Sequence, residues 1–194
     1  MRPKSYHASL KTLIFTAVMG SLGNSLFVLS QTVLNWGQVT LDLSHVGTFI
    51  AAIYGGPLAG LVAGLIVGVG PGLYYGYLGG SLGLIGLLGL PIGKALSGIS
   101  VGLLAKWLKI GNRRFSSLLA VLIIIIGYVP ECIFTIFIFK VLVAIFLPLA
   151  APFLIPVLVP ILIKAWIEIT IMGFFMGALT GNTGFSNFIR QYFS

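Results

Sequence analysis

The sequence predicts an all-α membrane protein with six transmembrane helices, and its composition and hydropathy pattern are the main reasons. The 194 residues are 58% hydrophobic and only 7% charged, whereas a soluble domain carries about 25% charged residues. The apolar segments are continuous and lack strand-like alternation, which favours helices over a membrane barrel. At about 20 residues per spanning helix, the chain has room for roughly six spans in a single integral membrane domain.

The basic residues indicate how these helices are oriented. The chain carries 11 Lys and Arg against 3 Asp and Glu, a net charge of +8. The basic residues lie at the ends of apolar runs, which is typical of cytoplasmic loops and not of a nucleic-acid surface. Six crossings then place both termini in the cytoplasm of a multi-pass protein of the cell membrane. The first apolar run resembles a signal sequence without a convincing cleavage site, so we expect it to remain as the first helix.

The first helix, expected over residues 10–30, carries small side chains on one face. Ala17, Gly20, Ser21 and Asn24 are spaced i, i+3, i+4 and i+7. Small residues at this spacing let another helix approach closely, and such packing drives helix association in lipid. The face could contact a neighbouring helix of the same chain, or it could dock a partner subunit.

A polar loop is expected on the outer side between helices 1 and 2, over residues 31–45. It contains Trp36, Asp42 and His45. Tryptophan suits the interface between membrane and water. Two interpretations stay open for this segment: an interfacial loop, or a lid over an outward-facing cavity.

A Gly55-Gly56-Pro57 break interrupts the apolar run that follows this loop. Proline removes a helix hydrogen bond and clashes with the preceding turn, so two short helices are predicted to meet there. Gly60, Gly64 and Gly68 then recur every four residues and predict a bare helix face for tight packing. The glycine-rich residues 70–89 are expected to return to the outer surface.

Three further helices complete the predicted bundle, over residues 87–107, 115–139 and 156–179. Lys140 is expected to end the second of these on the outside. Prolines at 148, 152, 156 and 160 predict an irregular outer connection before the last helix.

Ionisable residues inside these helices are functional candidates, because burying a charge in a membrane is costly. A rise of about 1.5 Å per residue places one group of ionisable residues in the outer half of the membrane. This group consists of Asp42, His45, Glu131, Lys140, Lys164 and Glu168. The clustering predicts one polar cavity open to the outside. Lys164 could instead pair with Glu168, four residues away, or with Glu131. Lys94, in the middle of the helix expected over residues 87–107, could snorkel outward or join the cavity.

Two short motifs carry a resemblance to a known protein family. Leu41-Asp42-Leu43-Ser44, followed by Gly56-Pro57-Leu58-Ala59-Gly60, resembles the substrate-binding S component of energy-coupling factor (ECF) vitamin transporters. The resemblance implies capture of a vitamin-like molecule from outside, driven by a transmembrane coupling (T) subunit and two cytoplasmic ATPase subunits. The family docks the T subunit through an Ala-xxx-Ala pair, and the nearest match here is Ala17-xxx-Ser21. A family lysine near the start of helix 6 matches Lys164.

The ligand is expected to be a small heterocycle whose ring packs against aromatic side chains while charged groups orient it. Buried glutamates beside aromatic rings suit a thiamine-like cation, and a lysine suits a riboflavin-like carbonyl. The expected substrate-binding residues are Trp36, Asp42, His45, Tyr128, Glu131, Lys164 and Glu168. No cofactor and no metal site is expected, since Cys132 is the lone cysteine and the two histidines lie far apart in the sequence.

Other function classes stay open beside this one. A secondary transporter, a channel or a scaffold subunit would also be small and apolar, although no internal repeat is evident. An intramembrane enzyme is less favoured, because a protease would want two aspartates and Asp42 is the only one. A Glu131–Glu168 pair could in principle do acid–base work.

Overall fold

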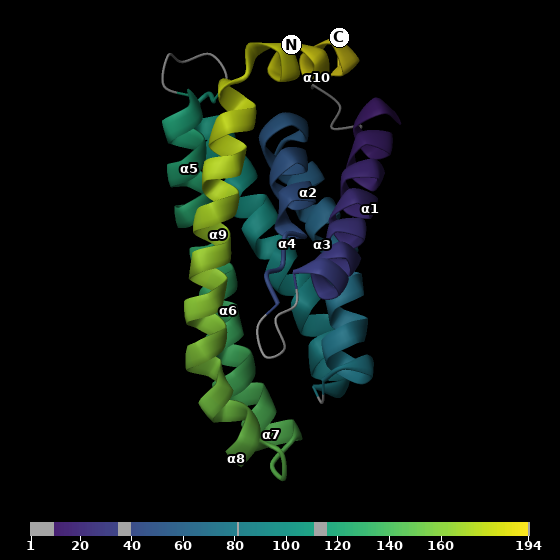
Figure 1. Cartoon of the computed structure of the whole chain (residues 1–194), viewed down its shortest axis with the longest axis vertical. Coiled ribbons are helices and arrows are strands. Elements are labelled where there is room, and N and C mark those ends of the chain that lie inside the picture. The colour runs from purple at the N-terminus through teal and green to yellow at the C-terminus, as the bar shows by residue number, and fades with distance from the viewer. Residues whose placement is uncertain (1–9, 35–39, 81, 111–115, 194) are drawn as a thin grey trace, which may run out of the picture.

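The structure is a computed structural model that describes residues 10–34, 40–80, 82–110 and 116–193. Within these ranges the chain is helical and contains no strand (Figure 1). Five helical segments are long and apolar enough to cross a membrane. They are Leu10–Val33, Pro57–Leu78, Gly83–Trp107, Ser116–Phe146 and Ala151–Gly181.

The first half of the chain forms α1 to α4. The bounds are α1 Leu10–Val33, α2 His45–Ile50, α3 Pro57–Leu73 and α4 Gly83–Trp107. Two π-helical turns, η1 (Ala51–Gly55) and η2 (Tyr74–Leu78), prolong α2 and α3. The glycine-rich segment that was expected to be a surface return is therefore mostly helix, with α4 beginning four residues earlier than predicted.

The second half of the chain forms two long, segmented helices and a terminal one. The first long helix comprises α5 (Ser116–Gly127), α6 (Val129–Phe137), η3 (Ile138–Leu142) and α7 (Val143–Phe146). The second comprises α8 (Ala151–Leu154), η4 (Ile155–Val157) and α9 (Leu158–Gly181). Each is longer than predicted: the first continues past Lys140, which was expected to end it, and the second begins at Ala151 and not at Pro156. Helix α10 (Thr183–Phe193), which was not predicted, lies across one end of the bundle (Figure 1).

The predicted break at Gly55-Gly56-Pro57 is confirmed. Gly56 has a φ of 91°, and Pro57 occupies the first turn of α3, where its missing N–H is tolerated. The two helices that meet here are unequal, however. The segment His45–Gly55 is about 16 Å long, half of the hydrocarbon core, whereas Pro57–Leu78 is long enough to span it.

The glycine ridge on α3 packs directly against α4, as predicted. A Cβ atom on Gly60, Gly64 or Gly68 would collide with backbone atoms of Gly98, Lys94 or Pro91 respectively. Backbone-to-backbone contact of this kind lets helices associate closely in lipid. The ridge also fixes the position of Lys94, whose own carbonyl group lies against Gly64.

The small-residue face of α1 divides between two environments. Gly20 is buried against Ile66 of α3, and Asn24 donates a hydrogen bond to the Ile66 carbonyl oxygen (2.8 Å). Ala17 and Ser21 are exposed. The face therefore serves internal packing at Gly20 and Asn24 and leaves only Ala17 and Ser21 open.

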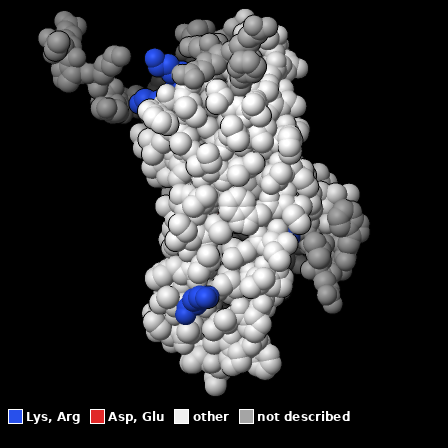
Figure 2. Space-filling view, turned by 90° about the vertical axis from the view of Figure 1, so that its left-hand side faces the viewer, with Lys and Arg blue, Asp and Glu red and all other residues white. Residues whose placement is uncertain are grey.

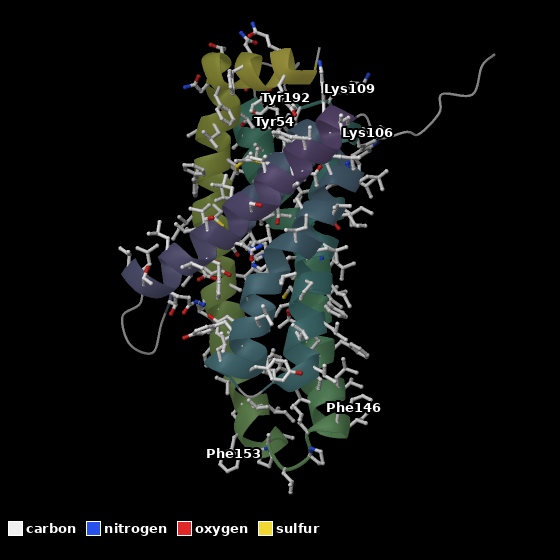
Figure 3. All side chains as sticks on the ribbon, turned by 90° about the vertical axis from the view of Figure 1, so that its right-hand side faces the viewer. Tyr54, Lys106, Lys109, Phe146, Phe153 and Tyr192 are labelled. Atoms are coloured by element: carbon white, nitrogen blue, oxygen red, sulfur yellow. The ribbon has the colours of Figure 1, made fainter. Side chains whose placement is uncertain are left out.

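The two ends of the bundle differ in character. Lys106, Lys109, Tyr54 and Tyr192 lie toward one end, where α10 also lies, whereas the opposite end carries Phe146 and Phe153 (Figure 3). The Tyr192 hydroxyl donates a hydrogen bond to the Lys11 carbonyl oxygen at 3.1 Å. The start of α1 and the end of the chain thus lie together at the basic end.

Candidate ligand-binding site

A cavity of about 420 Å³ lies between the helices, and all three acidic residues of the chain line it. Of the seven residues expected at a binding site, the structure brings six to this cavity. They are Asp42, His45, Tyr128, Glu131, Lys164 and Glu168. Trp36 lies outside the described residues. On the face drawn in Figure 2 no acidic side chain is visible, and most of the surface is uncharged.

The polar residues lie near the middle of the spans and not toward one face as predicted. Glu131 lies fifteen residues from each end of Ser116–Phe146, and Lys94 lies eleven and thirteen residues from the ends of α4. Asp42 and His45 reach this depth because α2 is short and begins inside the bundle. Lys140, which was expected to join the group, is exposed on η3 and does not line the cavity.

Lys94 is the centre of the polar network. Its Nζ lies 2.8 Å from Ser44 Oγ, 2.9 Å from His45 Nδ1 and 3.3 Å from Asp42 Oδ2. Its side chain is 3% exposed. Three partners match the three protons of an ammonium group, so the donors of Lys94 are fully used. The sequence left open whether Lys94 snorkels outward or joins the cavity. In the structure Lys94 lines the cavity.

His45 connects Lys94 to Glu131. Because an ammonium nitrogen only donates, Nδ1 of His45 accepts, and the ring carries its proton on Nε2. That nitrogen lies 2.9 Å and 3.2 Å from the two carboxylate oxygens of Glu131. Ser97 donates a further bond to Glu131 Oε2 at 2.5 Å. The chain of donors therefore runs from Lys94 through His45 to Glu131.

Asp42 links the start of α2 to both α4 and α9. Its carboxylate accepts from the Ser44 N–H (2.8 Å) and from Lys94, and its own backbone N–H donates to Glu168 Oε1. The Lys94 ammonium group therefore provides the counter-charge of the buried Asp42 carboxylate.

The hydrogen bonds divide the cavity residues into two groups. Asp42, His45, Lys94 and Glu131 have partners for every charged or ring atom, so they are saturated by the protein itself. Lys164 and Glu168 form a pair at 3.3 Å, and the Lys164 side chain is 30% exposed. Among the described residues, neither Glu168 Oε2 nor the Tyr128 hydroxyl has a hydrogen-bond partner. Of the residues expected at the site, Tyr128, Lys164 and Glu168 therefore keep polar atoms open to a ligand.

Aromatic rings form part of the cavity wall. Tyr128 packs edge-on against Trp166, with ring centroids 5.1 Å apart, and meets His45 at 6.4 Å. Tyr74 and Tyr75 line the cavity as a second edge-on pair at 5.1 Å. Trp166 does not line the cavity and packs against Tyr128 from outside it. The tyrosine pair was expected at the membrane surface and forms cavity wall because its segment is helical.

Sequence reasoning missed Ser44 and Ser97 as members of the network. Neither is exposed, and both bond to charged groups. Their signal in the sequence was weak: Ser44 follows Asp42 at the start of a helix, and Ser97 lies three residues after Lys94. In the part of the chain that the structure describes, no cluster of three or more histidine, cysteine or acidic side chains is arranged to hold a metal ion.

Comparisons with models of known protein families, with curated proteins and with solved structures give no match to this chain.

Proposed function

We propose that this chain is a membrane-embedded substrate-binding subunit, similar in role to the S component of ECF importers. The observation that carries the proposal is the mid-span cavity that gathers every acidic residue of the chain. Charged groups at this depth are costly and are kept where they serve a ligand or an ion. A binding subunit needs such a site and no catalytic module of its own.

The cavity favours a small heterocycle as the ligand. Its volume is within the range of sites that enclose small organic molecules, about 300 to 1,000 Å³. Tyrosine and aliphatic side chains can cover a flat ring, while Lys164 and Glu168 offer an ammonium and a carboxyl group to its polar edge. The cavity holds three carboxyl groups against two ammonium groups, which suits a thiamine-like cation. A riboflavin-like carbonyl facing Lys164 is the next candidate.

The proposed topology has six crossings, with the short segment His45–Gly55 as part of the second. The chain direction reverses from α1 to α2, α2 to α3, α3 to α4, α4 to α5 and α7 to α8, and both ends of the described chain lie at the basic end (Figure 1). By the distribution of Lys and Arg, this end would face the cytoplasm of the cell. Ligand would then reach the cavity from the outside.

Uptake would depend on partner proteins. We propose a transmembrane coupling subunit that docks on the exposed part of the α1 small-residue face, at Ala17 and Ser21, and two cytoplasmic ATPase subunits that drive transport. Gly20 does not belong to this docking face, because it is buried against α3.

The first test is native mass spectrometry of the gently purified protein, with extraction and identification of any bound small molecule. A stoichiometric vitamin or heterocycle is the expected result. The Lys164→Met variant should lose it, whereas Lys140→Met, at an exposed lysine of the span Ser116–Phe146, should keep it. A lipid alone, followed by no thermal shift across a vitamin panel, would overturn the proposal. Sustained isotope uptake by the protein without partners would favour a secondary transporter.

A further inference from the structure

The connection between α7 and α8 has an unusual composition. Between Lys140 and Lys164 lie 23 residues, and none of their side chains is charged or can form a hydrogen bond. A connection in water normally carries polar turn residues such as Asn, Asp, Ser or Gly. Here the turn consists of proline, alanine and leucine. Such a composition suits a hydrocarbon environment better than water.

The connection also extends beyond the rest of the bundle. The segments Ser116–Phe146 and Ala151–Gly181 have 31 residues each, about 46 Å of helix, against 22 and 25 residues, about 33 to 38 Å, for Pro57–Leu78 and Gly83–Trp107. Figure 1 shows α7 and α8 projecting at the end opposite α10. We call residues 143–157 the hairpin tip.

One side of the hairpin tip is packed and the other is uncovered. Val143 and Ala151 are buried in an apolar cluster with Ile138, Phe139 and Leu158. On the outer side, Phe146, Leu149 and Phe153 are 67%, 93% and 79% exposed. Three large apolar side chains at one projecting end form a surface that would be unfavourable in water.

The backbone of the hairpin tip fits the same environment. The N–H groups of Leu147, Ala150, Ala151, Phe153 and Leu154 all donate to carbonyl groups within the tip. Pro148 and Pro152 have no N–H to satisfy. Among the described residues the Leu149 N–H forms no backbone hydrogen bond. Most backbone donors of the connection are therefore bonded internally, which is the condition that lipid imposes on non-helical chain.

We propose that the hairpin tip is inserted in the bilayer, with acyl chains covering Phe146, Leu149 and Phe153. The excess length on this side of the molecule is accommodated by tilt or by local thickening of the bilayer. Because Phe139 and Ile161, at the base of the tip, line the cavity, the inserted hairpin closes this side of the cavity with an apolar wall. This inference does not depend on the identity of the ligand.

The test uses one nitroxide spin label on the full-length protein in phosphatidylcholine vesicles. Cys132 is the lone cysteine, so the C132A background carries L149C at the tip, I133C as a lipid-facing reference near mid-span, and N187C as a reference on α10. Collision rates with oxygen and with a water-soluble nickel chelate are measured by power saturation. F153C provides a second tip site should L149C fold poorly.

We expect the tip label to collide often with oxygen and rarely with the nickel chelate, as at Ile133. Frequent collision with the nickel chelate, as expected at Asn187, would place the tip in water and overturn the proposal. Low collision rates with both reagents would show that protein covers the tip, either a second copy or a partner, and would overturn it equally.

Discussion

The backbone N–H of Asp42 donates a hydrogen bond to the carboxylate of Glu168, 126 residues further along the chain. The same carboxylate oxygen lies 3.3 Å from Lys164 Nζ. Glu168 therefore ties the start of α2 to α9, next to the lysine that we propose as a ligand contact. A ligand that binds Lys164 or Glu168 would therefore compete with the hydrogen bond between Glu168 and the Asp42 N–H.

Replacing Glu168 by alanine should destabilise the fold more than replacing it by glutamine. Alanine leaves the buried N–H of Asp42 without an acceptor, at a cost of about 1 to 3 kcal/mol in the free energy of unfolding, whereas glutamine retains an acceptor oxygen. Unfolding in detergent micelles, followed by circular dichroism, measures both. Lys164→Met is the control that spares the Asp42 bond. Equal losses for alanine and glutamine would contradict this role of the N–H bond.

Lys94→Met should be among the most destabilising substitutions in the chain. It leaves the Asp42 carboxylate buried without its counter-charge, which costs about 3 to 5 kcal/mol in comparable ion pairs. The double variant Lys94→Met/Asp42→Asn should recover part of that loss, because it removes the orphaned charge. Lys140→Met, at an exposed position, should stay near wild type. Without recovery in the double variant, the pairing of Lys94 with Asp42 would not explain the loss.

The clustering of charges was predictable from the sequence because ionisable groups inside a membrane need partners. With only three acidic residues in the chain, Asp42, Glu131 and Glu168 were the available partners for buried cations. The pairing itself was not predictable. Lys94 joins Ser44 and His45 only because the glycine contacts of α3 and α4 place its backbone beside α2, and a single sequence does not specify such a contact.

The depth of the cluster was predicted wrongly for a related reason. Pattern analysis predicted two short helices at Gly56-Pro57 but counted the first of them as a full crossing that begins at the outer face. It therefore assigned Asp42 and His45 to the outer face. The ends of the two longest helices were also missed, because the apolar run from Val141 to Ile163 contains no polar residue that would mark a boundary.

Gly64→Ala should weaken the bundle, whereas Gly173→Ala should not. A Cβ atom on Gly64 collides with the Lys94 backbone, so the two helices must separate. Around Gly173 the nearest atoms are 3.6 Å away, an ordinary contact. There the substitution is expected to be neutral or stabilising by about 0.5 to 1 kcal/mol, because alanine favours a helix. The apparent melting temperatures of the two variants provide the comparison, and a similar decrease in both would refute the packing argument.

Ala17→Trp should block assembly with the proposed coupling subunit while leaving ligand binding unchanged. Ala17 is exposed on α1, so the larger side chain disturbs an approaching helix but not the bundle. Exposed Val18→Trp, at the next position and therefore on a different part of the helix surface, is the matched control. Co-purification of the partner and retention of the bound molecule are measured together. Normal co-purification with the Ala17 variant would exclude this face as the docking surface.

Thr48→Val should stabilise the protein. Thr48 is fully buried in α2, and its Oγ1 is the one buried side-chain polar atom that lacks a hydrogen-bond partner among the described residues. An unsatisfied buried hydroxyl costs about 1 to 3 kcal/mol, and valine has nearly the same shape. The free energy of unfolding should therefore rise, while Thr48→Ser, which keeps the hydroxyl and loses the methyl group packed near Gly98, should lower it. A loss of ligand binding in Thr48→Val without loss of stability would instead assign the hydroxyl a part in the site.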